Sequence, residues 1–238
     1  MSREKGLWIS FGGVDSDEQD IRVAALPEIP IAAARGAAVE IPGRDGTLWL
    51  ADETFDDVTL EVELEFDEER LDDAARWLSG KGELILSSLE EFCWRARVER
   101  GIALKPGTYA GGRLRGTAAF VCQPFRYRPG RPAMAPITAP KRFSGQGTWP
   151  ARPVITVHGS GDIHLMLNGA TVLFTGVDGR ITLDCEAMMA FRDGVNASGQ
   201  VSILSDDDAW PVLSTGQNSI NWSGAVEKIV IVPNWRWR

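Results

Sequence analysis

Cysteine is scarce in this sequence, and its spacing does not indicate a disulfide framework or a metal site. Cys93, Cys122 and Cys185 are the three cysteines among 238 residues, odd in number and far apart. A disulfide scaffold or a zinc knuckle needs paired or closely spaced cysteines. Neither class fits, and the three residues are expected to be small buried hydrophobes.

Long hydrophobic runs are also missing. The apolar group Leu7-Trp8-Ile9 is too short for a signal peptide, and no later run approaches the length that spans a membrane. Positive charge is not in excess either, because 25 basic residues face 33 acidic ones, for a formal charge of -8. We therefore expect folding in the cytosol, no membrane insertion and no general attraction to nucleic acid.

Catalytic motifs are absent from the sequence. Both histidines, His158 and His164, fall in one expected hairpin, and a Ser160/His/Asp162 arrangement is not expected to form a triad, because sequence neighbours on an extended strand point to opposite faces. There is no Gly-x-Ser-x-Gly elbow, Walker lysine or dinucleotide fingerprint. Residues 206–208, three aspartates, lack the glycine and distal glutamate of a calcium loop. We expect no enzyme activity, metal or cofactor.

The clearest pattern that is present runs from residue 58 to residue 66. Apolar and polar residues alternate, which predicts a half-buried strand with an acidic outer row. The apolar positions are Val58, Leu60, Val62, Leu64 and Phe66, and the outer ones are Thr59, Glu61, Glu63 and Glu65. Asp67 then suits a helix N-cap, and apolar residues at helical spacing predict one amphipathic helix over residues 68–79, before Gly80.

The remainder of the first half is rich in strand and turn signals. Strands are expected at residues 7–11, 21–26, 39–41, 47–50, 83–87, 92–100 and 117–122. The turn chemistry of Pro42-Gly43-Arg44-Asp45-Gly46 predicts a hairpin between the third and fourth of these. The first domain, residues 1–130, is therefore expected to be mainly β with one helix.

A change of composition predicts a second domain. Residues 124–142 hold five prolines, five basic residues and no acidic ones, as in a semi-rigid linker. We place the linker at residues 131–151 and a β-sandwich at residues 152–238. Asn168-Gly169 between two alternating runs is a strong hairpin signal, and turns are also expected at residues 159–162, at Asp178-Gly179 and at Ser223-Gly224.

Several phrases in a fixed order resemble one protein family. They are Thr117-Ala-Ala-Phe-Val-Cys-Gln-Pro-Phe-Arg-Tyr127, Gly147-Thr-Trp-Pro-Ala-Arg-Pro-Val-Ile-Thr-Val-His-Gly159, Leu167-Asn-Gly169, Ile181-Thr-Leu-Asp184, Trp210-Pro-Val-Leu-Ser-Thr-Gly-Gln-Asn-Ser-Ile-Asn-Trp-Ser-Gly224 and Pro233-Asn-Trp-Arg236. Together they resemble the distal tail proteins (Dit) of long, non-contractile-tailed bacteriophages. The likeness spans most of the chain and is strongest in its second half.

The resemblance implies an N-terminal domain related to tail-tube proteins, a β-barrel or split sheet with one helix, and a C-terminal galectin-like β-sandwich. It implies a homo-hexameric ring that joins the tail tube protein to the tail-tip hub, with DNA passing through its lumen. Receptor-binding proteins are further partners in that family. The implied location is the virion tail tip, after assembly in the host cytoplasm, and no catalysis is implied.

The acidic row has two interpretations. Between Asp52 and Asp73 there are twelve carboxylates and one arginine, which is typical of a solvated face that keeps a protein soluble. The alternative hypothesis is that Glu61, Glu63 and Glu65 line the lumen of the ring, where they repel the phosphates of passing DNA.

The basic and aromatic residues of the middle and the end of the sequence are expected to make protein–protein contacts and not to bind nucleic acid. Arg126 and Arg128 are either solvated or paired with an acidic surface of another subunit or domain. Trp222 and Trp235 are expected to pack in the sandwich core or an interface, with a sugar-stacking platform as the alternative. Arg236 and Arg238 are candidates for pairing with carboxylates of the first domain.

Two functions remain open at this stage. The first is a ring-forming structural component of a phage tail tip, and the second is a monomeric carbohydrate-binding module with a β-rich companion domain. The number of protomers in solution distinguishes them, because only the first requires closed rotational symmetry.

Overall fold

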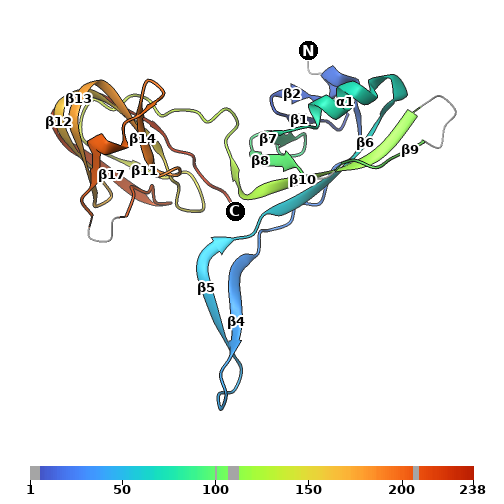
Figure 1. The fold of residues 1–238 in the computed structure, drawn as a ribbon, viewed down its shortest axis with the longest axis horizontal. Helices are drawn as coiled ribbons and strands as arrows, with labels where there is room; N and C mark the ends of the chain where they lie inside the picture. Colours follow the sequence, from blue (N-terminus) through green and yellow to red (C-terminus); the bar gives the residue numbers. More distant parts are fainter. Residues whose placement is uncertain (1–5, 100, 107–112, 206–208) are drawn as a thin grey trace. The chain divides into compact units, whose positions relative to one another are not determined.

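A computed structural model describes residues 6–99, 101–106, 113–205 and 209–238 (Figure 1). The expected strand end at Arg100 and the three aspartates at 206–208 lie outside the described residues. The described chain is mainly β and divides into two compact units, one of residues 1–129 with Arg238 and one of residues 130–237. None of its helices is long and apolar enough to cross a membrane.

The first unit is built on an eight-stranded antiparallel sheet. Its central path runs in the order β2-β1-β7-β8-β10-β6-β3, with β9 paired to β10. The strands are β1 (Ile9–Phe11), β2 (Val14–Asp15), β3 (Arg22–Ala25), β6 (Val58–Asp67), β7 (Lys81–Leu86), β8 (Cys93–Val98), β9 (Leu104–Pro106) and β10 (Arg113–Tyr127). The longest pairing joins β6 to β10, from Val58 opposite Cys122 to Asp67 opposite Arg113.

The alternation predicted for residues 58–66 is confirmed. Val58, Leu60, Val62, Leu64 and Phe66 are all buried, whereas the residues between them are exposed or half-buried. The expected helix is also present, as a 3-10 turn η2 (Glu68–Arg70) that continues into α1 (Leu71–Trp77). It buries Ala74 and Leu78 against the sheet side of the unit.

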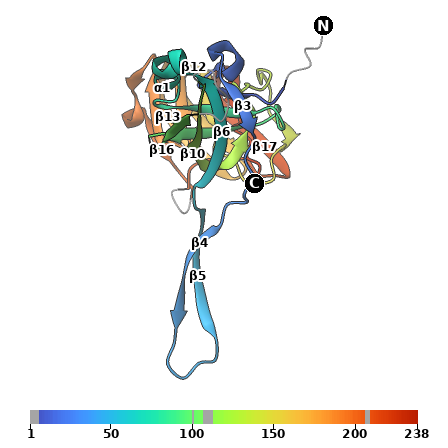
Figure 2. The ribbon, with the colours of Figure 1, turned by 90° about the vertical axis from the view of Figure 1, so that its right-hand side faces the viewer.

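A separate two-stranded hairpin belongs to the same unit. It pairs β4 (Ala34–Glu40) with β5 (Thr47–Phe55), and no other strand of the described chain joins this sheet. The turn is closed by the Arg44 amide, which donates to the Ile41 carbonyl at 3.1 Å. Figures 1 and 2 show the hairpin extending away from the large sheet of its unit.

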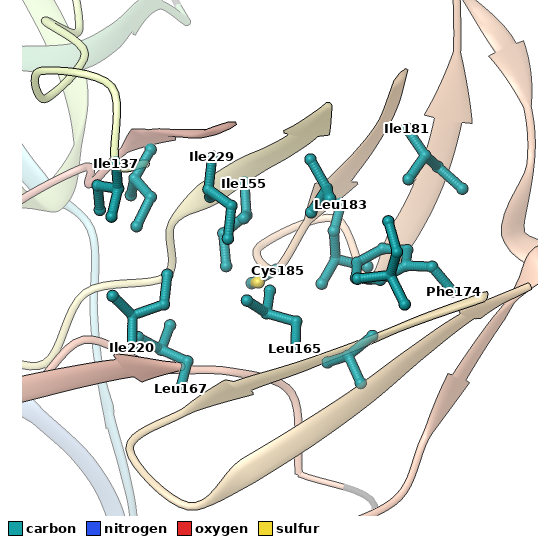
Figure 3. Close-up of a cluster of buried hydrophobic side chains, with 14 of the residues drawn as sticks. Ile137, Ile155, Leu165, Leu167, Phe174, Ile181, Leu183, Cys185, Ile220 and Ile229 are labelled. Atoms are coloured by element: carbon teal, nitrogen blue, oxygen red, sulfur yellow. The ribbon is translucent and has the colours of Figure 1, made fainter. Parts of the chain in front are cut away.

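The second unit contains a seven-stranded antiparallel sheet in the order β11-β17-β12-β13-β14-β15, with β16 paired to β13. Its strands are β11 (Lys141–Ser144), β12 (Val154–Leu167), β13 (Ala170–Asp184), β14 (Met189–Arg192), β15 (Val195–Asn196), β16 (Val201–Ile203) and β17 (Gln217–Val232). The long strands bury one apolar core, which includes Ile155, Leu165, Phe174 and Ile229 (Figure 3).

Three expected turns in this unit are wrong, whereas the Asn168-Gly169 hairpin is confirmed. Residues 159–162, Asp178-Gly179 and Ser223-Gly224 lie inside continuous strands. Gly161, Gly179 and Gly224 have positive φ, and Gly161 (+75°) and Gly224 (+101°) lie where the strand register shifts. A glycine of that kind serves a β-bulge as well as a turn.

The expected linker at residues 131–151 is instead part of the second unit. β11 pairs with β17, and Ile137 and Trp149 form β-bridges to Ile229 and Arg236. The prolines allow this because isolated bridges and short edge strands tolerate missing amide donors.

Candidate functional site

The acidic row lies on the outer face of β6, where it meets arginines of β10. Arg113 bonds Glu65 at 3.1 Å and approaches Asp67 at 3.3 Å, and Arg115 pairs with Glu63. Arg113 stands directly opposite Asp67, whereas its bond to Glu65 and the Arg115–Glu63 pair are diagonal contacts between antiparallel strands. The face is therefore a row of alternating charges.

Glu61 differs from the other two glutamates of the row. It stands opposite Ala119, is exposed, and makes no ion pair within the described residues. The bonds from Glu65 and Glu63 raise the pKa of Arg113 and Arg115, so both guanidinium groups stay charged. Ion pairs this exposed contribute little to stability, and their effect is mainly on the charge that the face presents.

The β4–β5 hairpin presents apolar residues to solvent. Trp49 is 56% exposed and Leu50 is 55% exposed, and Val39 and Ile41 are also exposed. All seven residues of β4 are exposed, so the hairpin is covered on neither face by its own unit. An isolated two-stranded hairpin is only marginally stable in water, and large apolar groups gathered on it mark a contact surface.

Specific contacts set the shape of this hairpin. The ring of Trp49 lies over Gly36, where an added Cβ would come within 2.8 Å of it. At the base, Arg35 pairs with Asp56 at 3.0 Å, and Glu53 has a φ of +59° beside a register shift. Sequence reasoning predicted the hairpin but missed its exposed Trp49 and Leu50, although a tryptophan so near a Pro-Gly turn is a usable signal.

The basic residues of the proline-rich segment 124–142 are divided between the two units. Arg128 pairs with Glu91 at 2.9 Å within the first unit, where Arg126 and Arg128 both lie over the Phe92 ring. Arg131 donates to the side-chain oxygen of Asn234 at 3.0 Å within the second unit. These bonds hold neighbouring loops of the same unit.

The aromatic residues of the C-terminal segment pack within the second unit. Trp235 is 7% exposed and belongs to the apolar core, and Trp222 packs against that core while partly exposed. Arg236 pairs with Glu186 of the same unit at 3.3 Å. Arg238 is grouped with the first unit, where it donates to the Ala32 carbonyl at 2.9 Å and lies over the Phe55 ring.

The cysteine, histidine and aspartate side chains considered for catalysis are not arranged as a catalytic or metal site in the described residues. Burial raises the pKa of each cysteine thiol, Cys93, Cys122 and Cys185, to about 12, so none is a thiolate at neutral pH. The Asp162 carboxylate accepts a hydrogen bond from the Gly176 amide at 2.9 Å. Burial, with Lys228 and Arg180 nearby, lowers the pKa of His158. Across the described ranges, no three His, Cys, Asp or Glu residues are grouped to hold a metal ion.

Comparison with known proteins gives one informative likeness. Neither the protein-family models nor the curated protein sequences contain a match. Among solved structures, the chain is similar to SPP1 Dit (gp 19.1), described as "a Paradigm of Hub Adsorption Apparatus in Gram-positive Infecting Phages". The TM-score is 0.73 at 16% identity, over 95% of this chain and 98% of that one. The chain therefore has the Dit fold along nearly its full length.

Proposed function

We propose that the protein is a structural component of a phage tail tip, a distal tail protein whose copies close into a hexameric ring. The ring joins the tail tube protein to the tail-tip hub and can anchor receptor-binding proteins. The observation that carries this proposal is the fold: both units, in the same order, match SPP1 Dit over 95% of the chain. A likeness confined to one unit would not distinguish a tail protein from other β-sandwich proteins.

The exposed apolar residues of the β4–β5 hairpin support assembly independently of the comparison with known proteins. Trp49 and Leu50 are exposed on a hairpin that its own unit leaves uncovered, and we propose that a different surface of a neighbouring copy covers them. Such heterologous contacts generate a closed ring when the rotation between copies closes. In the described part of the chain β4 and β5 pair with each other in a two-stranded sheet, and the outer edge of such a sheet can accept a strand from a neighbouring copy.

Light scattering after size-exclusion chromatography tests the proposal. We expect a mass about six times the 26.0 kDa of one chain, and annular particles in negative-stain images. The alternative function, a monomeric carbohydrate-binding module, gives one protomer. A single compact particle at high concentration, with no binding to tail components, contradicts the ring.

The face formed by β6 and β10 is proposed to line the lumen. Four carboxylates of β6 face three guanidinium groups, so the row keeps a negative excess; they are Glu61, Glu63, Glu65 and Asp67 against Arg113 and Arg115 of β10 and Arg22 of β3. DNA binds proteins by exchanging counterions for cationic side chains. A face whose arginines are already engaged by carboxylates lets DNA pass without holding it.

Replacing Glu61, Glu63 and Glu65 together by lysine tests the lumen assignment. We expect the ring to assemble, because these side chains lie on the outer face of the sheet and do not belong to its core. We expect genome ejection from reconstituted particles to be impaired. The matched variant replaces the same three residues by glutamine, which frees the facing arginines without adding cations, and should impair ejection less than the lysine variant does. Normal ejection by the lysine variant would remove these residues from the lumen.

A further inference from the structure

The outer face of the sheet in the second unit carries a row of residues that its core does not explain. Thr156 of β12 stands opposite Thr182 of β13, which stands opposite Phe191 of β14. Their chain neighbours Ile155, Ile181 and Ala190 are buried in the core. Because successive side chains of a strand point to opposite faces, this row points away from the core, and a half-buried phenylalanine lies on it.

A cavity of about 450 Å³ opens over this row. Its lining is Thr156, Arg180, Thr182, Phe191, Asp193 and Gly194. Asp193-Gly194 forms the tight turn between β14 and β15, with φ of +49° and +81°. This is the Asp-Gly hairpin turn that positive φ at both central positions favours, and it brings the Asp193 carboxylate to Arg180.

The polar side chains of the cavity hydrogen-bond to one another but do not use all of their donors and acceptors. Arg180 donates through both Nε, at 2.9 Å, and Nη2 to the same oxygen, Oδ1 of Asp193. Neither bond uses Nη1 of Arg180 or Oδ2 of Asp193, so within the described residues both atoms remain available to a ligand. The Oγ1 atoms of Thr156 and Thr182 lie 3.0 Å apart, and because each hydroxyl can donate once, one O–H donor and further lone pairs remain there.

The combination of groups selects a ligand class. An aromatic ring beside a few fixed polar groups is typical of a small-molecule site, and a ring face suits the C–H face of a pyranose. The hydroxyl groups of a saccharide, each a donor and an acceptor, can bond both a guanidinium N–H and a carboxylate oxygen, and Arg180 and Asp193 both line this cavity. Since Arg180 is already compensated by Asp193, the site has no local cationic excess to attract an anion. We propose that this cavity binds a neutral saccharide through stacking on Phe191 and hydrogen bonds to Arg180, Asp193 and the two threonines.

The site is shallow, so one copy should bind weakly, with a dissociation constant of about 1 mM. Several copies on one assembly would raise the avidity without any new contact. The inference does not depend on assembly, because every lining residue belongs to one unit of one chain.

The test uses the full chain on an array of neutral and acidic oligosaccharides, followed by saturation-transfer NMR titration of the strongest neutral binder. We expect Phe191→Ala to weaken binding at least about tenfold, and Thr182→Val, which keeps the side-chain shape, to weaken it severalfold. Met189→Ala is the matched control, since Met189 is on the same strand and face but outside the cavity. Circular dichroism verifies that each variant is folded.

Three results would overturn the assignment. The first is no saturation transfer to any neutral oligosaccharide at a concentration about tenfold above the expected dissociation constant. The second is binding restricted to acidic saccharides. The third is equal binding by Phe191→Ala and Met189→Ala. Each is independent of the protomer count, so a failure of this site and a failure of the ring are distinguishable.

Discussion

Replacing Trp49 and Leu50 by serine should convert the assembled protein into monomers. Both side chains are more than half exposed on a hairpin that its own unit does not cover. Truncating a buried tryptophan anchor at an interface costs about 2 kcal/mol or more, and losing the burial of a leucine side chain costs roughly 2 kcal/mol. Losing two anchors at every contact of a ring weakens each contact by roughly a thousandfold, which is enough to dissociate it at micromolar concentration.

Light scattering over a dilution series measures this effect. The matched control is Leu204→Ser, which removes a comparably exposed leucine, 50% accessible, from the second unit and should leave the mass unchanged. Monomer stability should also be unchanged for the double variant apart from local fraying, because neither residue belongs to a core. If the double variant retains the parent mass, the hairpin is not the contact. If the parent is itself monomeric, the ring proposal fails instead.

Local patterns predicted the parts of the fold that local physics determines. The alternation of Val58 to Phe66 specifies one buried face whatever strand lies beside it, and Asn168-Gly169 specifies a two-residue turn. The helix after Asp67 was predictable for the same reason, since apolar spacing fixes its period.

The wrong predictions were made where a tight turn and a β-bulge require the same residue types. Gly161, Gly179 and Gly224 all adopt positive φ, as a turn would require, but each lies within a long strand. At Gly224 the deciding factor is non-local, whereas a Cβ added at Gly161 or Gly179 would meet nothing within 4 Å. At Gly224, an added Cβ would lie 2.4 Å from the Asp162 carbonyl of the paired strand, so glycine is there to admit a neighbouring backbone, and a single sequence does not reveal that neighbour.

The candidate surfaces show the same limit. The glutamates of β6 were visible as an outer row, but their partners Arg113 and Arg115 are about fifty residues later and meet them only through the register of β6 with β10. The saccharide cavity combines residues from three strands and a turn. Pairing register, more than residue type, determines which of these groups become neighbours.

The core of the second unit should be sensitive to the loss of one leucine. Leu165 is completely buried among the apolar residues of the core (Figure 3) and stands between Val172 and Trp222 on the neighbouring strands. Leu165→Ala removes buried methyl groups and leaves a cavity that a closely packed interior fills only in part. We expect the free energy of unfolding of this unit to fall by about 2–5 kcal/mol, a large fraction of the stability of an ordinary domain.

Leu204→Ala is the matched control for this prediction, because it makes the same chemical change at a half-exposed position of the same unit. Its effect should stay within about 0.5 kcal/mol. Chemical denaturation followed by tryptophan fluorescence measures both variants, since Trp222 and Trp235 report on this core. Equal losses in the two variants would mean that the packing at Leu165 is not that of a close-packed interior, and the sandwich that carries the proposed saccharide cavity would then lack the rigid support that such a site requires.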